Sequence, residues 1–401
     1  MGFLIWSSIL VTLKLVLAPH ISTFASAKWL SYSADIGIIV ISATTLLMNG
    51  GSRKISFQVL LTIIALNALI ALSAIVNEVD LFESLANSAR TLGPLLYFFA
   101  LLSLKEVGRR KVGMVGCYVV LVSCTLAVVG FVTLPNATNR DEVWWPAYFD
   151  GLHSSSYVLF ACALIGYVLL KHRVYRQGWV KLTVVAAMLF CCWAFLFAWG
   201  VRTVISASLV GYLLYRFRAR YIMLTVLIGL IVVAQIGGTV GFDYGFADLD
   251  FFSSGRLSMY EEKVNQLARN DVAGWLIGNG YGSDLIATNV WWWAEKGAHN
   301  DFITFLVENG ALYIFVFFLL LAVLLRACKG HPFAVCVTYS MIFTSLVSNG
   351  YFVRPLPAYV MFLALYMSMV LSKSQRHQHL QSGSQASLPE HSMPAGAVYR
   401  P

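Results

Sequence analysis

Long apolar runs separated by short polar connections dominate the pattern of this chain. Runs such as Ile55 to Val76 and Tyr221 to Gly241 carry no charge, and each exceeds the roughly 20 residues that a helix needs to cross a bilayer core. The pattern predicts about twelve transmembrane helices, with approximate limits 2–18, 29–48, 55–76, 85–104, 112–134, 153–170, 179–199, 201–215, 221–240, 302–325, 332–348 and 356–372. The predicted fold class is therefore an all-α, polytopic integral membrane protein.

The spacing of these runs divides the chain into four parts. We expect transmembrane helices one to nine in 1–240, one large outward loop in 241–301, helices ten to twelve in 302–372, and a tail in 373–401. The first run is not expected to be a cleavable signal, because no basic residues precede it and further spans follow. From Gln375 the tail is rich in Ser, Gln, His and Pro, which predicts disorder.

Composition and charge give these spans an orientation. The chain is 59% hydrophobic and 12% charged, against roughly 25% charged in soluble domains. Of its 28 lysines and arginines, 18 lie in alternate connections and in the tail, which the positive-inside rule places in the cytoplasm together with both termini. The acidic residues lie mostly in or beside the opposite connections. The net charge of +9 is thus mainly a matter of topology, and no nucleic-acid partner is implied.

Metal and disulfide chemistry find little support in the sequence. The seven cysteines fall in spans or on the predicted cytoplasmic side, so no disulfide framework is expected, and no CxxC spacing occurs. The outward loops contain no HExxH motif. We therefore predict no metal site.

The large outward loop contains several candidate elements. Apolar residues recur at helical spacing between Arg256 and Arg269, which predicts an amphipathic helix along the membrane surface or over the bundle. Its predicted apolar stripe consists of Leu257, Tyr260, Val264, Leu267 and Ala268. The run Gly278-Asn-Gly280-Tyr-Gly282 predicts tight turns, with close approach to a ligand as the alternative. Trp291 to Trp293 is typical of an interfacial anchor, with stacking on a sugar as the alternative.

His299 is the candidate catalytic base. It stands in His299-Asn300-Asp301, immediately before the tenth apolar run. The positive end of a helix dipole disfavours a charged imidazole, and a neutral imidazole is what a general base requires. A histidine that only caps the helix beside Asn300 is the alternative. Asp301 is an accessory candidate.

Arginines outside the cytoplasmic set are the candidate anion ligands. Arg202 is flanked by apolar sequence on both sides, where a guanidinium is costly unless it is paired or faces a polar cavity. Arg256 opens the amphipathic segment, where its charge opposes the helix dipole and a bound anion would explain it. Arg354, in a short turn, and Arg90, after an acidic connection, are accessory candidates.

Three pieces in this order resemble the bacterial O-antigen ligase/polymerase superfamily of membrane glycosyltransferases. They are a span that starts with Arg202; Ser-Gly-Arg256, followed by a helix and Ile277-Gly-Asn-Gly280; and Ala298-His299-Asn300-Asp301, with Glu308-Asn-Gly310 further on. The resemblance covers mainly residues 195–320, and each motif alone is weak.

The resemblance implies a function and its residues. The family transfers a glycan from undecaprenyl pyrophosphate, with inversion and without a metal or other cofactor. Arg202 and Arg256 would bind the pyrophosphate, and His299 would deprotonate the attacking sugar hydroxyl. The chain is then expected in the bacterial inner membrane among membrane lipid, with its active site facing the periplasm. The single dominant periplasmic loop favours an O-antigen ligase, which uses lipid A–core as acceptor, over an O-antigen polymerase.

A twelve-span secondary transporter is the alternative from another class. Transporters usually show repeated halves, broken helices and charged residues near the midplane. The sequence shows no convincing repeat, and only Lys14 and Asp35 lie clearly within early spans.

Overall fold

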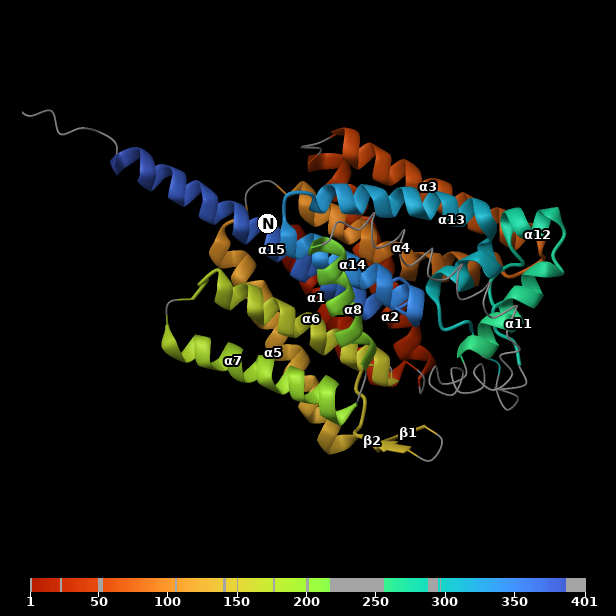
Figure 1. Cartoon of the computed structure of the whole chain (residues 1–401), viewed down its shortest axis with the longest axis horizontal. Helices are drawn as coiled ribbons and strands as arrows, with labels where there is room; N and C mark the ends of the chain where they lie inside the picture. Colours follow the sequence, from red (N-terminus) through yellow and green to blue (C-terminus); the bar gives the residue numbers. More distant parts are fainter. Residues whose placement is uncertain are drawn as a thin grey trace, which may run out of the picture.

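The computed structural model is almost entirely helical (Figure 1). It describes residues 2–21, 24–49, 53–104, 107–139, 142–149, 151–175, 177–199, 202–216, 256–287, 295 and 297–386, with the backbone alone at 53–55, 137–139, 142–144, 202, 256–257 and 374–386. The helices before the large loop are α1 (Gly2–Leu17), α2 (Ala25–Asn49), α3 (Arg53–Val76), α4 (Leu81–Ser103), α5 (Arg109–Thr133), α6 (Gly151–Lys171), α7 (Gly178–Trp193) and α8 (Arg202–Arg216). From Arg256 onward they are α11 (Arg256–Ala268), α12 (Val272–Ile277), α13 (Asp301–Cys328), α14 (Pro332–Val347) and α15 (Pro355–Ala386).

Three shorter elements complete the described structure. A 3-10 turn, η1 (Ala18–His20), follows α1, and a π-helical turn, η2 (Ala194–Ala198), continues α7. Strands β1 (Ala137–Asn139) and β2 (Glu142–Trp144) pair as a small antiparallel hairpin between α5 and α6.

Eleven of the twelve predicted spans coincide with described helices, and the remaining one, 221–240, lies outside the described residues. Within the described ranges, eight helices are long and apolar enough to cross a membrane; they lie in α1, α2, α3, α5, α6, α7 with η2, α13 and the first part of α15. Helix α14 is apolar but has only 16 residues, and α4 and α8 are not among the eight. The fold is that of a polytopic membrane protein, and the number of twelve crossings stays a prediction.

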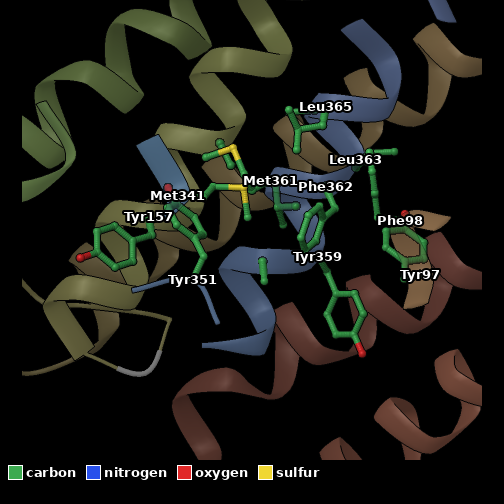
Figure 2. Close-up of a cluster of buried hydrophobic side chains, with 14 of the residues drawn as sticks. Tyr97, Phe98, Tyr157, Met341, Tyr351, Tyr359, Met361, Phe362, Leu363 and Leu365 are labelled. Atoms are coloured by element: carbon green, nitrogen blue, oxygen red, sulfur yellow. The ribbon is translucent and has the colours of Figure 1, made fainter. Parts of the chain in front are cut away.

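Helix α15 lies at the centre of the bundle. In the apolar window of its segment Pro355–Lys373, 89% of the residues are buried, whereas α1, α2, α3, α5, α7 and α13 reach at most 39%. Figure 2 shows Tyr359 and Phe362 of α15 beside Tyr97 and Phe98 of α4, and the ring centroids of Phe98 and Phe362 are 5.2 Å apart. The outer helices expose large apolar side chains such as Leu47, which suits a surface that faces lipid tails.

The C-terminal end of α15 differs from the prediction of a disordered tail that begins near Gln375. The helix continues to Ala386 and extends away from the bundle in Figure 1. Once a helix is nucleated, extension costs little, and the Gln, Arg and Lys residues of this segment have favourable helix propensity. The rest of the predicted tail, 387–401, lies outside the described residues.

Candidate functional site

The segment before α13 is fixed by a helix cap. Asn300 is the N-cap, and its Oδ1 accepts hydrogen bonds from the backbone N–H groups of Phe302 (3.0 Å) and Ile303 (3.1 Å). Such a cap is worth about 1 kcal/mol. The Asn300 amide also donates to the carbonyl of Leu346 (2.6 Å), which ties this segment to the end of α14. The capping role therefore belongs to Asn300 and not to His299.

His299 precedes the cap in an unusual backbone conformation. Its φ is +51°, in the left-handed region that non-glycine residues rarely adopt. Such a conformation costs of order 1–3 kcal/mol and persists only where the surroundings impose it. Hydrogen bonds hold the two neighbours of His299, Ala298 and Asn300, in place. The side chain of His299 is partly exposed at this end of α13.

Asp301, an accessory candidate from the sequence, anchors the start of α13. Its side chain is fully buried, and its carboxylate accepts hydrogen bonds from the backbone N–H groups of Gly350 (2.8 Å) and Phe352 (3.3 Å). These contacts attach the His299–Asp301 segment to the turn between α14 and α15. Asp301 thus holds the candidate base in place from inside the protein.

The same turn positions Arg354. Its Nε donates to the carbonyl of Asn349 (2.9 Å), and a terminal nitrogen donates to Oγ of Ser154 in the first turn of α6 (2.7 Å). Two bonds from different elements fix the plane of the guanidinium. Arg354 is therefore held rigidly at the end of the bundle where α6 and α15 begin.

Arg354 lines a cavity of about 220 Å³ together with Arg90 of α4 and Lys14 of α1. The polar part of the lining also includes Ser31 and Ser154, while the remainder is largely apolar. None of the described residues that line it is acidic. The structure thus brings both accessory arginines of the sequence to one cavity and adds a lysine.

Lys14 carries its charge inside a predicted span because Asp35 compensates it. The Lys14 Nζ lies 2.6 Å from Oδ2 of Asp35 and donates to Oγ of Ser31 (3.0 Å). Oδ1 of Asp35 accepts from the hydroxyl of Tyr359 (3.1 Å). Both charged side chains are almost completely buried, and such charges are tolerated in a membrane when they are paired in this way.

The two main arginine candidates open helices. Arg202 begins α8 and Arg256 begins α11, but their side chains lie outside the described part of the chain, as do Trp291 to Trp293. The start of α8 is located by Trp199, whose Nε1 donates to the carbonyl of Pro146 (3.2 Å) shortly before α6. Because the first turn of α6 borders the cavity, α8 begins at the same end of the bundle.

Helix α11 lies where the amphipathic helix was predicted, and of the predicted apolar stripe Leu267 is buried while Val264 is exposed. Its buried residues include Met259, Lys263 and Leu267, whereas Val264 is 62% exposed. Lys263 is completely buried because its ammonium lies 3.1 Å from Oδ1 of Asp284 and donates to the Asp284 carbonyl. Burial lowers the pKa of the Lys263 ammonium below its ordinary value, and the Asp284 carboxylate opposes that shift.

Asp284 connects this buried lysine to the candidate base. Its Oδ2 accepts from the backbone N–H of Ala298 (2.9 Å) and from the hydroxyl of Thr304 (2.7 Å) in the first turn of α13. These two contacts flank His299 on either side. The Lys263–Asp284 pair therefore fixes the segment that carries His299.

The glycine run 278–282 packs against a break in α13. At Gly310 the backbone leaves helical geometry (φ +77°, ψ +179°), so carbonyls before the break lack helical partners. The backbone N–H groups of Asn279 and Gly280 bond to the carbonyls of Val307 (2.9 Å) and Glu308 (3.0 Å). The glycines therefore allow the backbone of this loop to pack closely against α13. This packing indicates that the motif serves the structure and not the binding of a ligand.

Gly310→Ala is expected to detach this loop from α13. A Cβ at this position would lie 2.4 Å from the carbonyl oxygen of Leu276, and the backbone conformation is one that essentially only glycine adopts. We expect a loss of stability greater than the roughly 1–3 kcal/mol that backbone strain alone costs. Gly151→Ala is the matched control, since Gly151 has a similar φ of +89° and open space around its Cβ position. Equal thermal stability of both variants in detergent would contradict the close packing.

Comparison with known protein families and with curated proteins finds no match for this chain. A function therefore has to be inferred from the side chains gathered at this end of the bundle.

Several residues that shape this site carry no clear signal in the sequence. Asp284 lies between two glycine-containing stretches, and Lys263 reads as part of a polar helix face, so neither indicates a buried pair. Lys14 is noticeable as a charge in an apolar run, but nothing local indicates that it lines a cavity with Arg90 and Arg354. Each of these contacts joins residues far apart in the sequence.

Proposed function

We propose that the chain is an O-antigen ligase that transfers a glycan from undecaprenyl pyrophosphate to lipid A–core. The main support is that the His299–Asp301 segment is bonded to the turn that carries Arg354, beside a cavity with three cationic side chains. A base and cations at one end of a bundle are what transfer from a diphosphate donor requires. The order of the Arg202, Arg256 and His299 motifs adds to this support.

In the proposed reaction His299 takes the proton from a hydroxyl of the acceptor sugar. The hydroxyl oxygen attacks the anomeric carbon of the donor from the face opposite the diphosphate. A new C–O bond forms as the anomeric C–O bond to the diphosphate breaks, and undecaprenyl pyrophosphate leaves with both bonding electrons. Arg202 and Arg256 stabilise the charge that develops on the leaving group, because a guanidinium binds phosphate oxygens in a bidentate manner. The anomeric configuration is inverted.

The proposal includes an orientation in the bacterial inner membrane. The basic connections lie in the cytoplasm together with both termini, and the end with the cavity faces the periplasm. Arg326, in the last turn of α13, and Lys329, just after that helix, belong to the predicted cytoplasmic set, whereas the turn with Arg354 follows α14 at the opposite end. The acceptor and the lipid-linked donor would then meet His299 outside the cytoplasm.

Arg202→Ala is expected to reduce glycan transfer by about 10²–10³, the usual loss when a group that stabilises a developing oxyanion is removed. The matched control is Arg216→Ala, at the opposite end of the same helix. Both variants would be expressed in a strain that lacks the native gene, and capped lipid A–core and the lipid-linked glycan pool would be measured.

Three outcomes of this experiment separate the candidate activities. A ligase predicts that the empty strain and Arg202→Ala lose capped lipid A–core while long lipid-linked chains persist, and that Arg216→Ala restores capping. Caps of a single repeat in the empty strain would indicate an O-antigen polymerase instead. Normal capping in the empty strain would reject both assignments.

A secondary transporter is the second candidate, and two observations favour it. Helix α13 is broken at Gly310, and the Lys14–Asp35 pair is buried between two candidate spans. Discontinuous helices and intramembrane charges are common in transporters. The break in α13 is, however, filled by the 278–282 loop, and Asp35 is engaged by Lys14 and Tyr359. Both features therefore have a structural explanation.

A further inference from the structure

The cavity between α1, α4, α6 and the α14–α15 turn has the properties of a small anion site. Its lining combines the cations of Lys14, Arg90 and Arg354 with the hydroxyls of Ser31 and Ser154. The volume of about 220 Å³ is well above the roughly 10–15 Å³ that one water needs, and below the roughly 300–1,000 Å³ of pockets for drug-sized ligands. A compact polar group would therefore fit it better than a whole sugar repeat.

The charge balance of the cavity calls for a negative ligand. Asp35 compensates Lys14, and the buried Asp301 interacts electrostatically with Arg354, but no acidic side chain is among the described residues that line the cavity itself. Like charges that line one cavity repel one another, and an anion between them removes that cost. The cavity is thus complementary to an anionic group.

Each cation is held in place before any ligand binds. Arg354 is fixed by its bonds to Asn349 and Ser154. The guanidinium of Arg90 lies 5.7 Å from the centre of the Tyr32 ring, a cation–π arrangement. The Lys14 ammonium already donates to Asp35 and Ser31, and these two bonds fix its position in the cavity wall. Preorganised donors of this kind lower the cost of binding.

We infer that this cavity binds a phosphate group, with Arg354 and Arg90 as its direct ligands. Planar guanidinium groups match the oxygens of a phosphate, and the apolar residues Phe149, Val353 and Leu356 beside them suit the first carbons of a phosphorylated lipid. The inference rests on the proposed function in one respect: we take a polyprenyl phosphate as the source of the bound phosphate group.

Binding to the purified full chain in detergent tests this site. The chain would be titrated calorimetrically with sodium pyrophosphate and, in a separate arm, with undecaprenyl phosphate delivered in the same micelles. Arg354→Gln and Arg90→Gln are each expected to weaken binding by about tenfold or more, because each removes a charge-assisted contact. Arg354→Lys should fall between Arg354→Gln and the parent, since it keeps the charge but loses the bidentate geometry.

Lys28→Gln is the matched control. Its ammonium lies 5.8 Å from the same Tyr32 ring that Arg90 contacts, yet Lys28 does not line the cavity. Unchanged affinity in Lys28→Gln together with weaker binding in the arginine variants would support the site. Stronger binding of undecaprenyl phosphate than of pyrophosphate would identify the lipid as the source, and the reverse order would support the site with a free phosphate compound as its ligand.

Failure of this inference can be separated from failure of the proposed function. Folded Arg354→Gln and Arg90→Gln proteins that bind both probes as the parent does would overturn the site, whereas the transfer reaction is tested separately by Arg202→Ala and His299→Ala. If Arg354→Gln does not fold, Arg90→Gln alone decides, since the side chain of Arg90 is partly exposed. His299→Ala, in contrast, should keep phosphate binding even where it loses transfer.

Discussion

His299→Ala is expected to lower the rate of glycan transfer by about 10²–10⁴, the usual contribution of a positioned general base. The reason is that the attacking sugar hydroxyl is a poor nucleophile until its proton is removed. The strained backbone of His299, with φ +51°, and its fixed neighbours Ala298 and Asn300 are consistent with a side chain held for a specific task. The measurement is the rate at which a labelled lipid-linked glycan becomes attached to lipid A–core in membranes.

The control for this variant is His20→Ala. His20 is an exposed histidine at the end of η1, and its change should leave the transfer rate unaltered. Equal amounts of both variants in the membrane fraction would show that insertion is intact. A His299→Ala protein that transfers glycan at the parent rate would remove the proposed base from the mechanism.

Lys263→Ala is expected to destabilise the folded protein by about 3–5 kcal/mol, the typical cost of removing one partner of a buried ion pair. The change would leave the carboxylate of Asp284, which is 2% exposed, without its cation. Because Asp284 also accepts from Ala298 and Thr304, we expect the His299 segment to loosen as well. Thermal unfolding in detergent measures the loss of stability.

Two further variants make this second expectation specific. Glu261→Gln changes an exposed charge on the same helix and should have little effect on stability. The double variant Lys263→Met with Asp284→Asn leaves no uncompensated charge, so it should recover part of the stability lost in Lys263→Ala. If Lys263→Ala unfolds at the same temperature as Glu261→Gln, the pair is not an important contact.

The helices were largely predictable from the sequence because apolar runs of this length have few alternatives. In a bilayer every backbone polar group must find an internal partner, and a helix provides it. Eleven predicted spans therefore coincide with described helices to within a few residues at their starts. The start of α13 was also predictable, since Asn300 is a favourable capping residue directly before an apolar run.

The candidate site was predictable only in part. Helical periodicity placed Val264 in an apolar stripe with the charged residues on the other face, yet the structure buries Lys263 because Asp284, 21 residues further on, supplies a counter-charge. Gly310 interrupts a run that reads as a continuous helix, because the loop from Gly278 takes over the backbone hydrogen bonds. These contacts join residues that are far apart in the sequence, so a local sequence pattern cannot predict them.

Reconstitution tests the central claim most directly. The purified chain in proteoliposomes would be supplied with an undecaprenyl-pyrophosphate-linked glycan and lipid A–core, and the products would be followed by mass and by the anomeric configuration of the new linkage. We predict transfer of the glycan to lipid A–core with inverted configuration, and its loss in His299→Ala. The account would be contradicted if the folded parent protein transferred no glycan. It would also be contradicted if the His299→Ala variant transferred the glycan at the parent rate.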